Sequence, residues 1–328
     1  MLRAAVVGCG FIGAGEMVPD GGIQSHAAAW TLHPGVRLVG LADVAPQTVA
    51  TAAARWAAPG YVDAGQMLAA ERPDVVSVAT PDETHVQMLE LVLETPSVRA
   101  VLVEKPLALE PEVAERIVEH ARRRGVLLAV NYSRRFAPSH RRLKAWLAGK
   151  PLGTIEMIRG LYVRGIKHNG THWLDLARYL VGEVIGIRGS GPVAPEQVDA
   201  TIDVDLRFDS GARGHLQGLR GGEYSLFEMD LVGSLGRLQI SDSGERFQAF
   251  RGQPSRRFPG FQELAEMASP DGGLTDLLLH AATDLTEALE NGRAPACSGE
   301  DGVIALRLAT EALATARAED RTHAALGC

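Results

Sequence analysis

Two side chains of this sequence have the chemistry needed to move a proton and to stabilise charge on an alcohol oxygen. Lys105 precedes Pro106, whose ring restricts the chain and disfavours a helix at the lysine. An ammonium group held in this way can donate a hydrogen bond to a hydroxyl and stabilise a developing alkoxide. Histidine titrates near neutral pH, so His172 can take the hydroxyl proton as hydride leaves the carbon. We therefore predict that both are catalytic; a Lys105–Glu104 ion pair and a capping histidine are the alternatives.

The residues around His172 predict how it is positioned. Residues 167–175 read Lys-His-Asn-Gly-Thr-His-Trp-Leu-Asp, and Thr171 has the side chain of a helix N-cap. A helix over residues 172–180 places Asp175 on the same face as His172, one turn later. Asp175 is then able to fix the histidine tautomer or to bind a substrate hydroxyl.

Polar side chains near these residues are candidates for substrate binding. We predict this role for His168, Asn169 and Asp175, and for Arg134 and Lys167, whose charges suit a phosphate or carboxylate. Surface salt bridges are the alternative interpretation of the two cations. The spacing of His168 from His172 also suits zinc, but no third ligand is evident, so we predict no metal.

A hydride acceptor is predicted from glycines spaced G-x-G-x-x-G directly after an apolar, β-rich run. Gly8 permits a tight turn, Gly10 lets a pyrophosphate approach the backbone, and Gly13 lets the next helix pack closely. Phe11 and Ile12 lie inside the motif and are expected to contact the same ligand. An ordinary tight turn is the alternative interpretation of the glycines alone.

The second predicted strand, residues 36–43, ends in Asp43, which favours NAD over NADP. A carboxylate at this strand end accepts hydrogen bonds from the adenosine ribose and repels a 2′-phosphate. Asp43 follows Gly13 by thirty residues, where about twenty is usual. We interpret residues 14–24 as a loop inserted before a helix that starts near Ser25. This loop covers the cofactor, helps to form the substrate pocket, or has no function.

Strands and helices alternate through the first 130 residues, which predicts a parallel, doubly wound sheet with its ligand cleft at the carboxyl ends of the strands. The predicted strands are 3–8, 36–43, 74–80, 99–104 and 126–131, and the predicted helices are 25–33, 46–57, 64–71, 83–95 and 111–124. Polar residues follow three of these strands and are predicted to bind the cofactor: Thr80, Pro81, His85, Glu104, Lys105 and Asn131.

A different pattern begins near residue 150 and indicates a second domain. Residues 200–208 alternate apolar and polar side chains, which is typical of a strand with one solvated face. Further strands are predicted at 212–220, 224–232 and 235–241, and helices at 275–291 and 302–317. We expect a dinucleotide-binding domain over residues 1–130 and a substrate-binding and oligomerisation domain over 131–328.

The composition and net charge argue against a protein that binds nucleic acid or a membrane surface. Of the 328 residues 46% are apolar and 22% charged, and the net charge is −7. No apolar run reaches the roughly 18 residues that a membrane span needs, and no signal-peptide pattern is visible. The cysteines Cys9, Cys297 and Cys328 have no pairing or metal spacing, as in a reducing compartment. We expect a cytoplasmic protein.

Together these features resemble the Gfo/Idh/MocA oxidoreductases, the family of glucose–fructose oxidoreductase and inositol dehydrogenase. The motifs that carry the resemblance lie at 8–13, at 79–81 with His85, at 104–106, at Asn131, at 171–175 before 179–182, and at 298–302. The resemblance implies a Rossmann domain followed by an α+β domain with a large, mostly antiparallel open sheet. In the family this sheet commonly joins subunits, so we expect a homodimer or homotetramer. It also implies that Lys105 contacts substrate and nicotinamide, and that His172 relays the proton.

The chain departs from the family at His168, where many members have Asp four residues before the histidine. The departure leaves open whether His168 or Asn169 binds substrate or completes a different relay. Similar sequences with His-Asn-Gly-Ser/Thr-His belong to a branch near sugar-nucleotide and surface-polysaccharide genes, and the loop over 14–24 suits that branch.

The sequence predicts an NAD(H)-dependent oxidoreductase that transfers hydride between nicotinamide and a carbinol carbon of a sugar, cyclitol or nucleotide-activated sugar. We expect this small molecule as its partner, with no nucleic acid and no membrane. A cofactor-binding sensor without turnover is one alternative, which the missing Asp keeps open. A glycosidase that oxidises its substrate transiently and then eliminates is the other.

Overall fold

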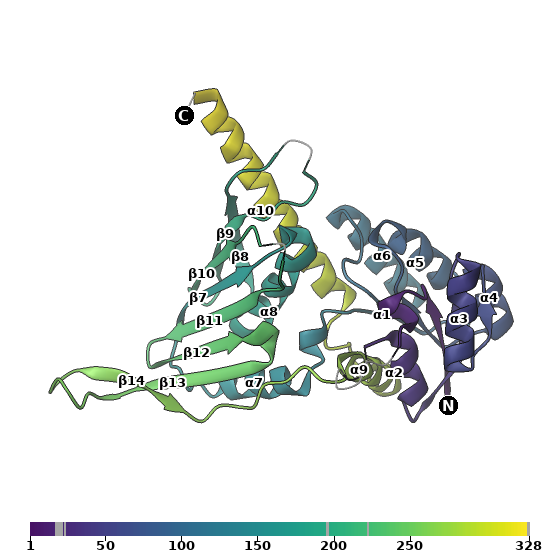
Figure 1. The fold of residues 1–328 in the computed structure, drawn as a ribbon, viewed down its shortest axis with the longest axis horizontal. Helices are drawn as coiled ribbons and strands as arrows, with labels where there is room; N and C mark the ends of the chain where they lie inside the picture. The colour runs from purple at the N-terminus through teal and green to yellow at the C-terminus, as the bar shows by residue number, and fades with distance from the viewer. Residues whose placement is uncertain (17–21, 23, 195–196, 222, 327–328) are drawn as a thin grey trace. The chain divides into compact units, whose positions relative to one another are not determined.

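The chain forms two compact units (Figure 1). The computed structural model describes residues 1–16, 22, 24–194, 197–221 and 223–326. Unit 1 comprises Met1–Ala137 and Thr275–Ile304, and unit 2 comprises Pro138–Leu274 and the residues from Ala305 on. The expected division at residue 130 placed all later residues in the second domain, whereas the contacts of Thr275–Ile304 are with unit 1.

Unit 1 is built on a six-stranded parallel sheet in the order β3-β2-β1-β4-β5-β6. Its strands are β1 Leu2–Val7, β2 Val36–Ala42, β3 Gly60–Tyr61, β4 Val75–Val78, β5 Ala100–Val103 and β6 Leu127–Val130. All residues of β4 and β5 are buried, as expected of short Val-, Leu- and Ala-rich strands covered on both faces. The predicted doubly wound sheet is confirmed.

The helices of unit 1 agree with the sequence pattern except at the first turn. They are α1 Phe11–Ala14, α2 His26–Leu32, α3 Pro46–Trp56, α4 Ala64–Glu71, α5 His85–Leu93, α6 Pro111–Arg124 and α9 Leu277–Asn291, with the 3-10 turns η1 Asp82–Thr84 and η2 Ser133–Arg135. Ser25 is the N-cap of α2, because its hydroxyl accepts a hydrogen bond from the Ala28 N–H at 3.3 Å. The one-turn helix α1 was not predicted. Within the expected loop over 14–24, residues 17–21 and 23 lie outside the described residues.

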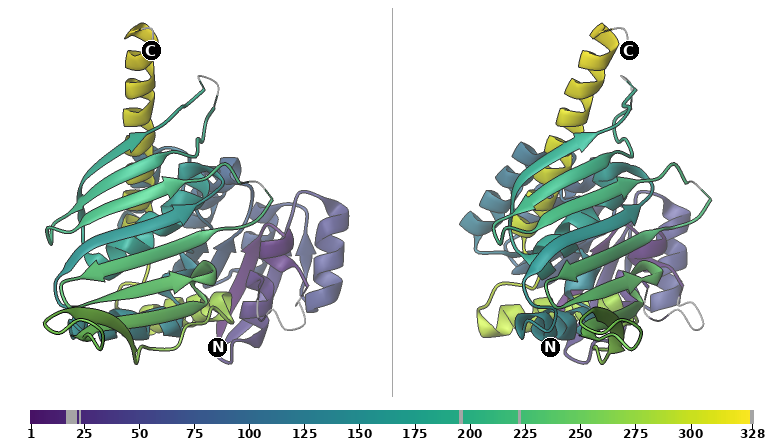
Figure 2. Two further views of the ribbon diagram at one scale, coloured as in Figure 1. Left: turned by 60° about the vertical axis from the view of Figure 1, so that its left-hand side comes forward. Right: turned by 90° about the vertical axis from the view of Figure 1, so that its left-hand side faces the viewer.

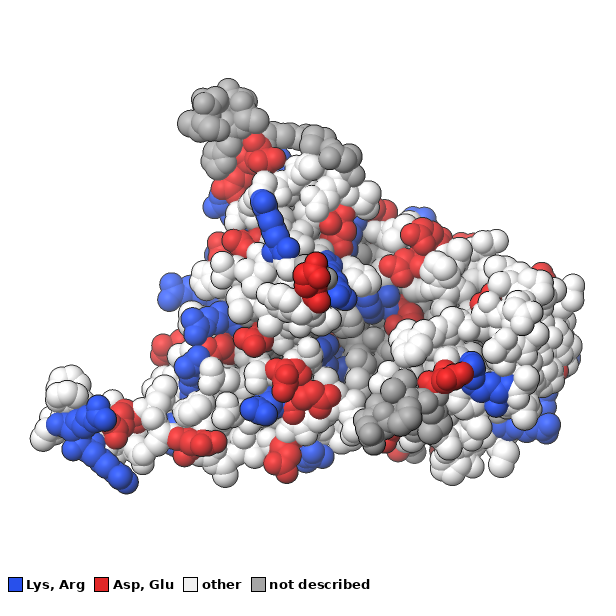
Figure 3. Space-filling model, in the orientation of Figure 1, with Lys and Arg blue, Asp and Glu red and all other residues white. Residues whose placement is uncertain are grey.

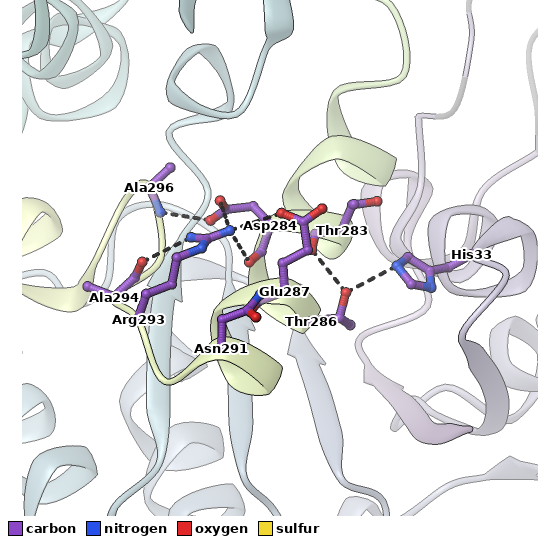
Figure 4. Close-up of polar contacts among 9 residues, drawn as sticks. All are labelled: His33, Thr283, Asp284, Thr286, Glu287, Asn291, Arg293, Ala294 and Ala296. Carbon is purple, nitrogen blue, oxygen red and sulfur yellow. Dashed lines mark hydrogen bonds and ion pairs between the residues drawn. The ribbon is translucent and has the colours of Figure 1, made fainter.

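Helix α9 and the loop that follows it carry a polar cluster, which reaches the end of α2 through one contact (Figure 4). The Asp284 carboxylate is 2% exposed; it accepts a hydrogen bond from the Ala296 N–H at 2.7 Å and pairs with Arg293 at 2.9 Å. On the neighbouring α2 turn, Nε2 of His33 lies 3.1 Å from the Thr286 hydroxyl. Burial lowers the pKa of His33 despite two nearby glutamates. Helix α9 packs on α2, β5 and β6 although it is distant in sequence, and the contact between His33 and Thr286 joins it to the end of α2.

The start of helix α10 (Gly299–Leu326) is also anchored in unit 1. Ser298 and Asp301 form a capping box, with N–H to side-chain bonds of 3.1 and 3.3 Å in the two directions. Asp301 also pairs with the buried Arg135 of η2 at 3.1 Å. Gly302 packs against Val130 at the end of β6 so closely that a Cβ would lie 2.7 Å from the valine side chain. The motif at 298–302 therefore fixes the chain that follows β6.

Unit 2 contains an eight-stranded sheet in the order β14-β13-β12-β11-β7-β10-β9-β8 (Figure 2). Its strands are β7 Ile155–Tyr162, β8 Val184–Ser190, β9 Asp203–Phe208, β10 Arg213–Gly218, β11 Phe227–Gly233, β12 Gly236–Ser241, β13 Arg246–Pro254 and β14 Gln262–Met267. Within the described strands of this sheet, only β7 and β10 pair in parallel, so the expected mostly antiparallel sheet is confirmed.

One face of this sheet carries helices and the other is uncovered in the described part of the chain (Figure 2). On the covered face α8 (Thr171–Val181) packs on β7, where Gly160 leaves room for the Trp173 indole. The indole donates a hydrogen bond to the Glu228 carbonyl at 3.1 Å. Helix α7 (Pro138–Ala148) packs against α8. The sheet therefore supports the helix that carries His172.

Charged side chains of both signs are interspersed on the face of the molecule shown in Figure 3. Basic side chains gather at the end of the β13–β14 hairpin, where Arg256 and Arg257 lie. Among the described helices, none is long and apolar enough to cross a membrane.

Candidate active site

The glycine turn joins β1 to α1, and the protein's own backbone requires two of its three glycines. Gly8 has a φ of 95°, and a Cβ there would overlap the Ala79 carbonyl. A Cβ on Gly13 would overlap the Gly8 carbonyl, so glycine at this position lets α1 lie close to the strand end. At Gly10 no described atom lies within 4 Å of the position that a Cβ would take. The fold itself does not need glycine there, whereas a ligand that approaches the backbone would need it.

Asp43 follows β2 and is tied to this turn. Its Oδ2 accepts a hydrogen bond from the Cys9 N–H at 2.8 Å, and its Oδ1 accepts one from the Ala45 N–H at 2.9 Å. Burial, with a smaller contribution from the Asp43 charge, raises the pKa of the Cys9 thiol to about 12. The carboxylate therefore lies beside the glycine turn, and its contact with the ribose stays a prediction; Cys9 is buried.

Phe11 and Ile12 begin α1 and expose large apolar side chains. They are 58% and 43% exposed, directly after the open position at Gly10. Removal of such a surface from water is favourable when a ligand covers it. Their predicted contact with the cofactor stays a prediction.

A hydrogen-bond network fixes the carboxylate that follows β5. Oε1 of Glu104 accepts a bond of 2.6 Å from the Asn131 amide and lies 3.1 Å from Nε2 of the buried His26. Burial by itself raises the pKa of Glu104, but the bond and charge of His26, the Asn131 amide and the Lys105 ammonium together lower it below its usual value. Glu104 is thus an anchored carboxylate that holds the backbone directly before Lys105. No local pattern around His26 predicts this contact, because it depends on how α2 packs.

His85 connects two of the strand-end loops. Its ring is fully buried, with Nδ1 2.7 Å from the Pro106 carbonyl and Nε2 2.8 Å from the Thr80 carbonyl. The Lys105–Pro106 peptide bond, next to the first of these carbonyls, is cis. The ring therefore braces the loops after β4 and β5, and direct contact of His85 with the cofactor stays a prediction.

Two buried polar atoms on these loops have no hydrogen-bond partner among the described residues. They are the Thr80 hydroxyl oxygen and Oδ1 of Asn131, which follow β4 and β6. Buried polar atoms are nearly always paired, so atoms of this kind indicate a ligand or ordered water. A hydroxyl and an amide carbonyl suit the ribose and carboxamide groups of a dinucleotide. Together with the open position at Gly10, unit 1 fits such a cofactor.

In unit 2, the helix of His172 begins earlier than the sequence predicts. Residues Gly165–Gly170 form a π-helical turn that continues into α8. Thr171 lies inside this helix, and its buried hydroxyl donates a hydrogen bond to the Lys167 carbonyl at 2.9 Å. The prediction of Thr171 as N-cap is wrong because other groups bind the first N–H groups of the helix.

This helical stretch brings together the other candidates of unit 2. His168 is exposed, Lys167, Asn169 and His172 are partly exposed, and Asp175 is 2% exposed. The Asn169 amide donates a hydrogen bond to a backbone carbonyl, that of Val163, at 2.9 Å. The described residues contain no group of three His, Cys, Asp or Glu side chains that could hold a metal ion. Arg134 lies apart from these residues along the chain, partly exposed in η2 of unit 1.

Comparison with known proteins identifies the family of the chain. Residues 2–132 match the model of an oxidoreductase family with an NAD-binding Rossmann fold, and residues 164–239 match the C-terminal domain of the same Gfo/Idh/MocA family. The chain is 27% identical over 271 residues to myo-inositol 2-dehydrogenase of Thermotoga maritima, which covers 76% of this chain and 79% of that protein.

Solved structures share the fold over almost the whole chain. UDP-N-acetylglucosamine 3-dehydrogenase from Acidithiobacillus ferrooxidans superposes with a TM-score of 0.79 at 21% identity and covers 97% of this chain and 98% of that one. A levoglucosan dehydrogenase in complex with NADH superposes with a TM-score of 0.80 at 19% identity and covers 97% of each chain. The two family models together span more than half of the sequence. The chain belongs to the Gfo/Idh/MocA family and is an NAD-dependent oxidoreductase.

Proposed function

We propose that this protein oxidises or reduces a secondary alcohol of a cyclitol or sugar, either free or nucleotide-activated. The observation that carries the proposal is the edge of the parallel sheet, where the glycine turn, Asp43 and the anchored Glu104–Lys105 pair all follow strand ends. The relatives support the substrate class, because one is a dehydrogenase of myo-inositol and another of a UDP-sugar.

The roles proposed for this chain concern the substrate hydroxyl. When bound, NAD supplies the hydride acceptor in the oxidative direction. Lys105 donates a hydrogen bond from Nζ to the carbinol oxygen and stabilises its developing negative charge. His172 takes the hydroxyl proton on a ring nitrogen and returns it in the reductive direction. Glu104 holds Lys105 in place through its bonds to His26 and Asn131.

We also propose that the unit 2 helix recognises the substrate. His168, Asn169 and Asp175 offer groups for sugar hydroxyls within two helical turns of His172. Lys167 and Arg134 offer charges for a phosphate or carboxylate if the substrate carries one. A free cyclitol would leave both cations without a ligand partner, so their substitution distinguishes the substrate types.

The uncovered face of the eight-stranded sheet is proposed to join subunits into a homodimer or homotetramer. On this face Asp230 of β11 pairs with Arg159 of β7 at 3.0 Å and with Arg237 of β12 at 2.6 Å, so these charges are compensated within the sheet. Sedimentation of wild type and Arg237→Glu tests this proposal. We expect the wild type to be oligomeric and the variant to dissociate; a monomeric wild type would contradict it.

A cytoplasmic location is proposed because the cofactor is NAD and because Cys9 and Cys297, the cysteines in the described part of the chain, are buried and form no disulfide. Recovery of the native protein from an extracytoplasmic fraction would refute this.

A substrate panel tests the proposed activity. NADH formation is followed with free cyclitols, free sugars and nucleotide-activated sugars at saturating NAD. We expect sustained turnover with one of these classes and none with simple alcohols. Binding of a ligand without turnover would indicate a sensor, and a product formed without net NADH would indicate transient oxidation and elimination.

A further inference from the structure

The helix that carries His172 receives its N-terminal hydrogen bonds from a segment thirty residues further along the chain. The first N–H groups of any helix lack partners within the helix and need an external acceptor. Here the bonds are Gly165 N to Thr201 Oγ1 (2.9 Å), Ile166 N to Ala200 O (2.9 Å), Lys167 N to Asp199 Oδ1 (2.8 Å) and His168 N to Asp199 Oδ2 (2.9 Å). Four successive donors are therefore bound by three successive residues.

Asp199 contributes most to this arrangement because both of its carboxylate oxygens accept a bond. A negative charge at a helix N-terminus also interacts favourably with the helix dipole. Gly165 makes room for it: its φ is 79°, and a Cβ there would overlap the Asp199 carboxylate. The glycine and the aspartate thus fit one another, and together they fix where the helix begins.

Asp199 also brings a carboxylate to the helical turn of His168, which lies four residues before His172. The backbone N–H of His168 is bound by Asp199, so a carboxylate lies at the same helical turn but comes from a different segment. We propose that Asp199 is a positioning residue for proton transfer: it fixes the first turn of this helix and thereby the place of His172 relative to the substrate oxygen. The proposal rests on the proton-transfer role proposed above for His172.

The segment 199–202 is held by bonds that do not involve the Asp199 side chain. The buried Tyr162 of β7 donates its hydroxyl hydrogen to the Ile202 carbonyl at 2.8 Å and accepts the Ile202 N–H at 2.9 Å. Ala200 binds the helix through its backbone carbonyl, which a substitution at 199 leaves in place. Variants at Asp199 are therefore expected to fold, with the change confined to the first helical turn.

The test compares Asp199→Ala and Asp199→Asn with matched changes at Asp63. Asp63 is the N-cap of α4 in unit 1 and accepts the Gln66 N–H at 2.7 Å, so Asp63→Ala also removes a capping carboxylate. We expect Asp199→Ala to lower kcat by about tenfold to 10²-fold, the size of effect that a misplaced catalytic group produces. Asp199→Asn keeps one acceptor and should fall between this variant and wild type. The KM for substrate should change less than kcat, the Kd for NAD should be unchanged, and the Asp63 variants should keep wild-type kcat.

Hydrogen exchange gives a readout that does not depend on activity. We expect the amides of Lys167 and His168 to exchange faster in both Asp199 variants.

Wild-type kcat in the Asp199 variants, a change in KM alone, or an equal loss of kcat in the Asp63 variants would overturn the proposal. If Asp199→Ala does not fold, Asp199→Asn is judged by the same criteria. His172→Ala separates the two proposals: an inactive His172 variant beside fully active Asp199 variants refutes only the role of Asp199, whereas an active His172 variant refutes the proposed mechanism itself.

Discussion

Alanine at Gly10 should weaken cofactor binding without destabilising the fold, whereas alanine at Gly13 should destabilise the fold. At Gly10 the backbone φ is −64°, which alanine adopts without strain, and no described atom lies within 4 Å of the new Cβ. Loss of the glycine's freedom in the unfolded chain then makes Gly10→Ala as stable as wild type, or more stable by about 0.4–1 kcal/mol. At Gly13 the new Cβ would lie closer than 3.0 Å to the Gly8 carbonyl, so the backbone must shift. Overpacking of this kind costs about 1–3 kcal/mol.

Gly10→Ala should lower the affinity for NAD although it does not lower the stability of the fold. A methyl group at Gly10 occupies the space through which a phosphate reaches the backbone N–H groups. Loss of one hydrogen bond to a charged group costs about 1.5–3 kcal/mol, which corresponds to an increase of at least about tenfold in the Kd for NAD. The assay is urea unfolding without NAD, followed by fluorescence titration with NAD. Wild-type Kd in Gly10→Ala, or wild-type stability in Gly13→Ala, would refute this account of the turn.

Three further predictions concern Asp43, Glu104 and Cys9. Asp43→Ala should bring the Kd values for NAD and NADP closer together, and an unchanged ratio would contradict its placement beside the ribose. The lowered pKa of Glu104 stabilises the fold fully above the unfolded-state pKa of about 4.3, and this contribution is lost as pH falls through the lower folded-state pKa. The unfolding free energy lost on Glu104→Gln should therefore shrink as the pH falls below about 4; a loss that does not shrink there would argue against it. With a pKa of about 12, Cys9 should resist iodoacetamide in the native state and react only after unfolding, as peptide mass spectrometry would detect; native-state labelling would contradict its burial.

The fold of unit 1 could be predicted from the sequence because its signals are local. Short, nearly continuous apolar strands are separated by amphipathic helices with recognisable starts, such as Ser25 before α2. In unit 2 the strands β7, β8, β13 and β14 and helix α7 were missed. Strand β14 reads Gln-Glu-Leu-Ala-Glu-Met, a set of helix formers, and becomes a strand because it pairs with β13. Strand β7 contains Gly160, where the absence of a side chain leaves room for the Trp173 indole. This glycine interrupts the alternation of apolar and polar side chains by which a strand is recognised in a sequence.

The candidate site was predicted where residues follow strand ends and missed where the contacts are non-local. Glu104 and Asn131 were predicted as candidates because each lies at the end of a predicted strand, but the contact of His26 with Glu104 depends on how α2 packs. Thr171 has the side chain of an N-cap, yet Asp199 supplies the cap from thirty residues away. No spacing in the sequence connects these positions, because a bond from Tyr162 of β7 to Ile202 holds the segment that follows residue 198 beside the helix.

The proposed mechanism requires that Lys105 and His172 act on one and the same carbinol. The most direct test is a double-mutant cycle on kcat, with Lys105→Ala, His172→Ala and the double variant, each shown to bind NAD like wild type. General acid–base help is worth about 10² to 10⁴ in rate, so each single variant should lose at least about 10²-fold. Residues that act as a unit are strongly non-additive, and we expect the double variant to be about as slow as the slower single variant. Losses that multiply in the double variant, or single variants that keep wild-type turnover, would contradict the claim.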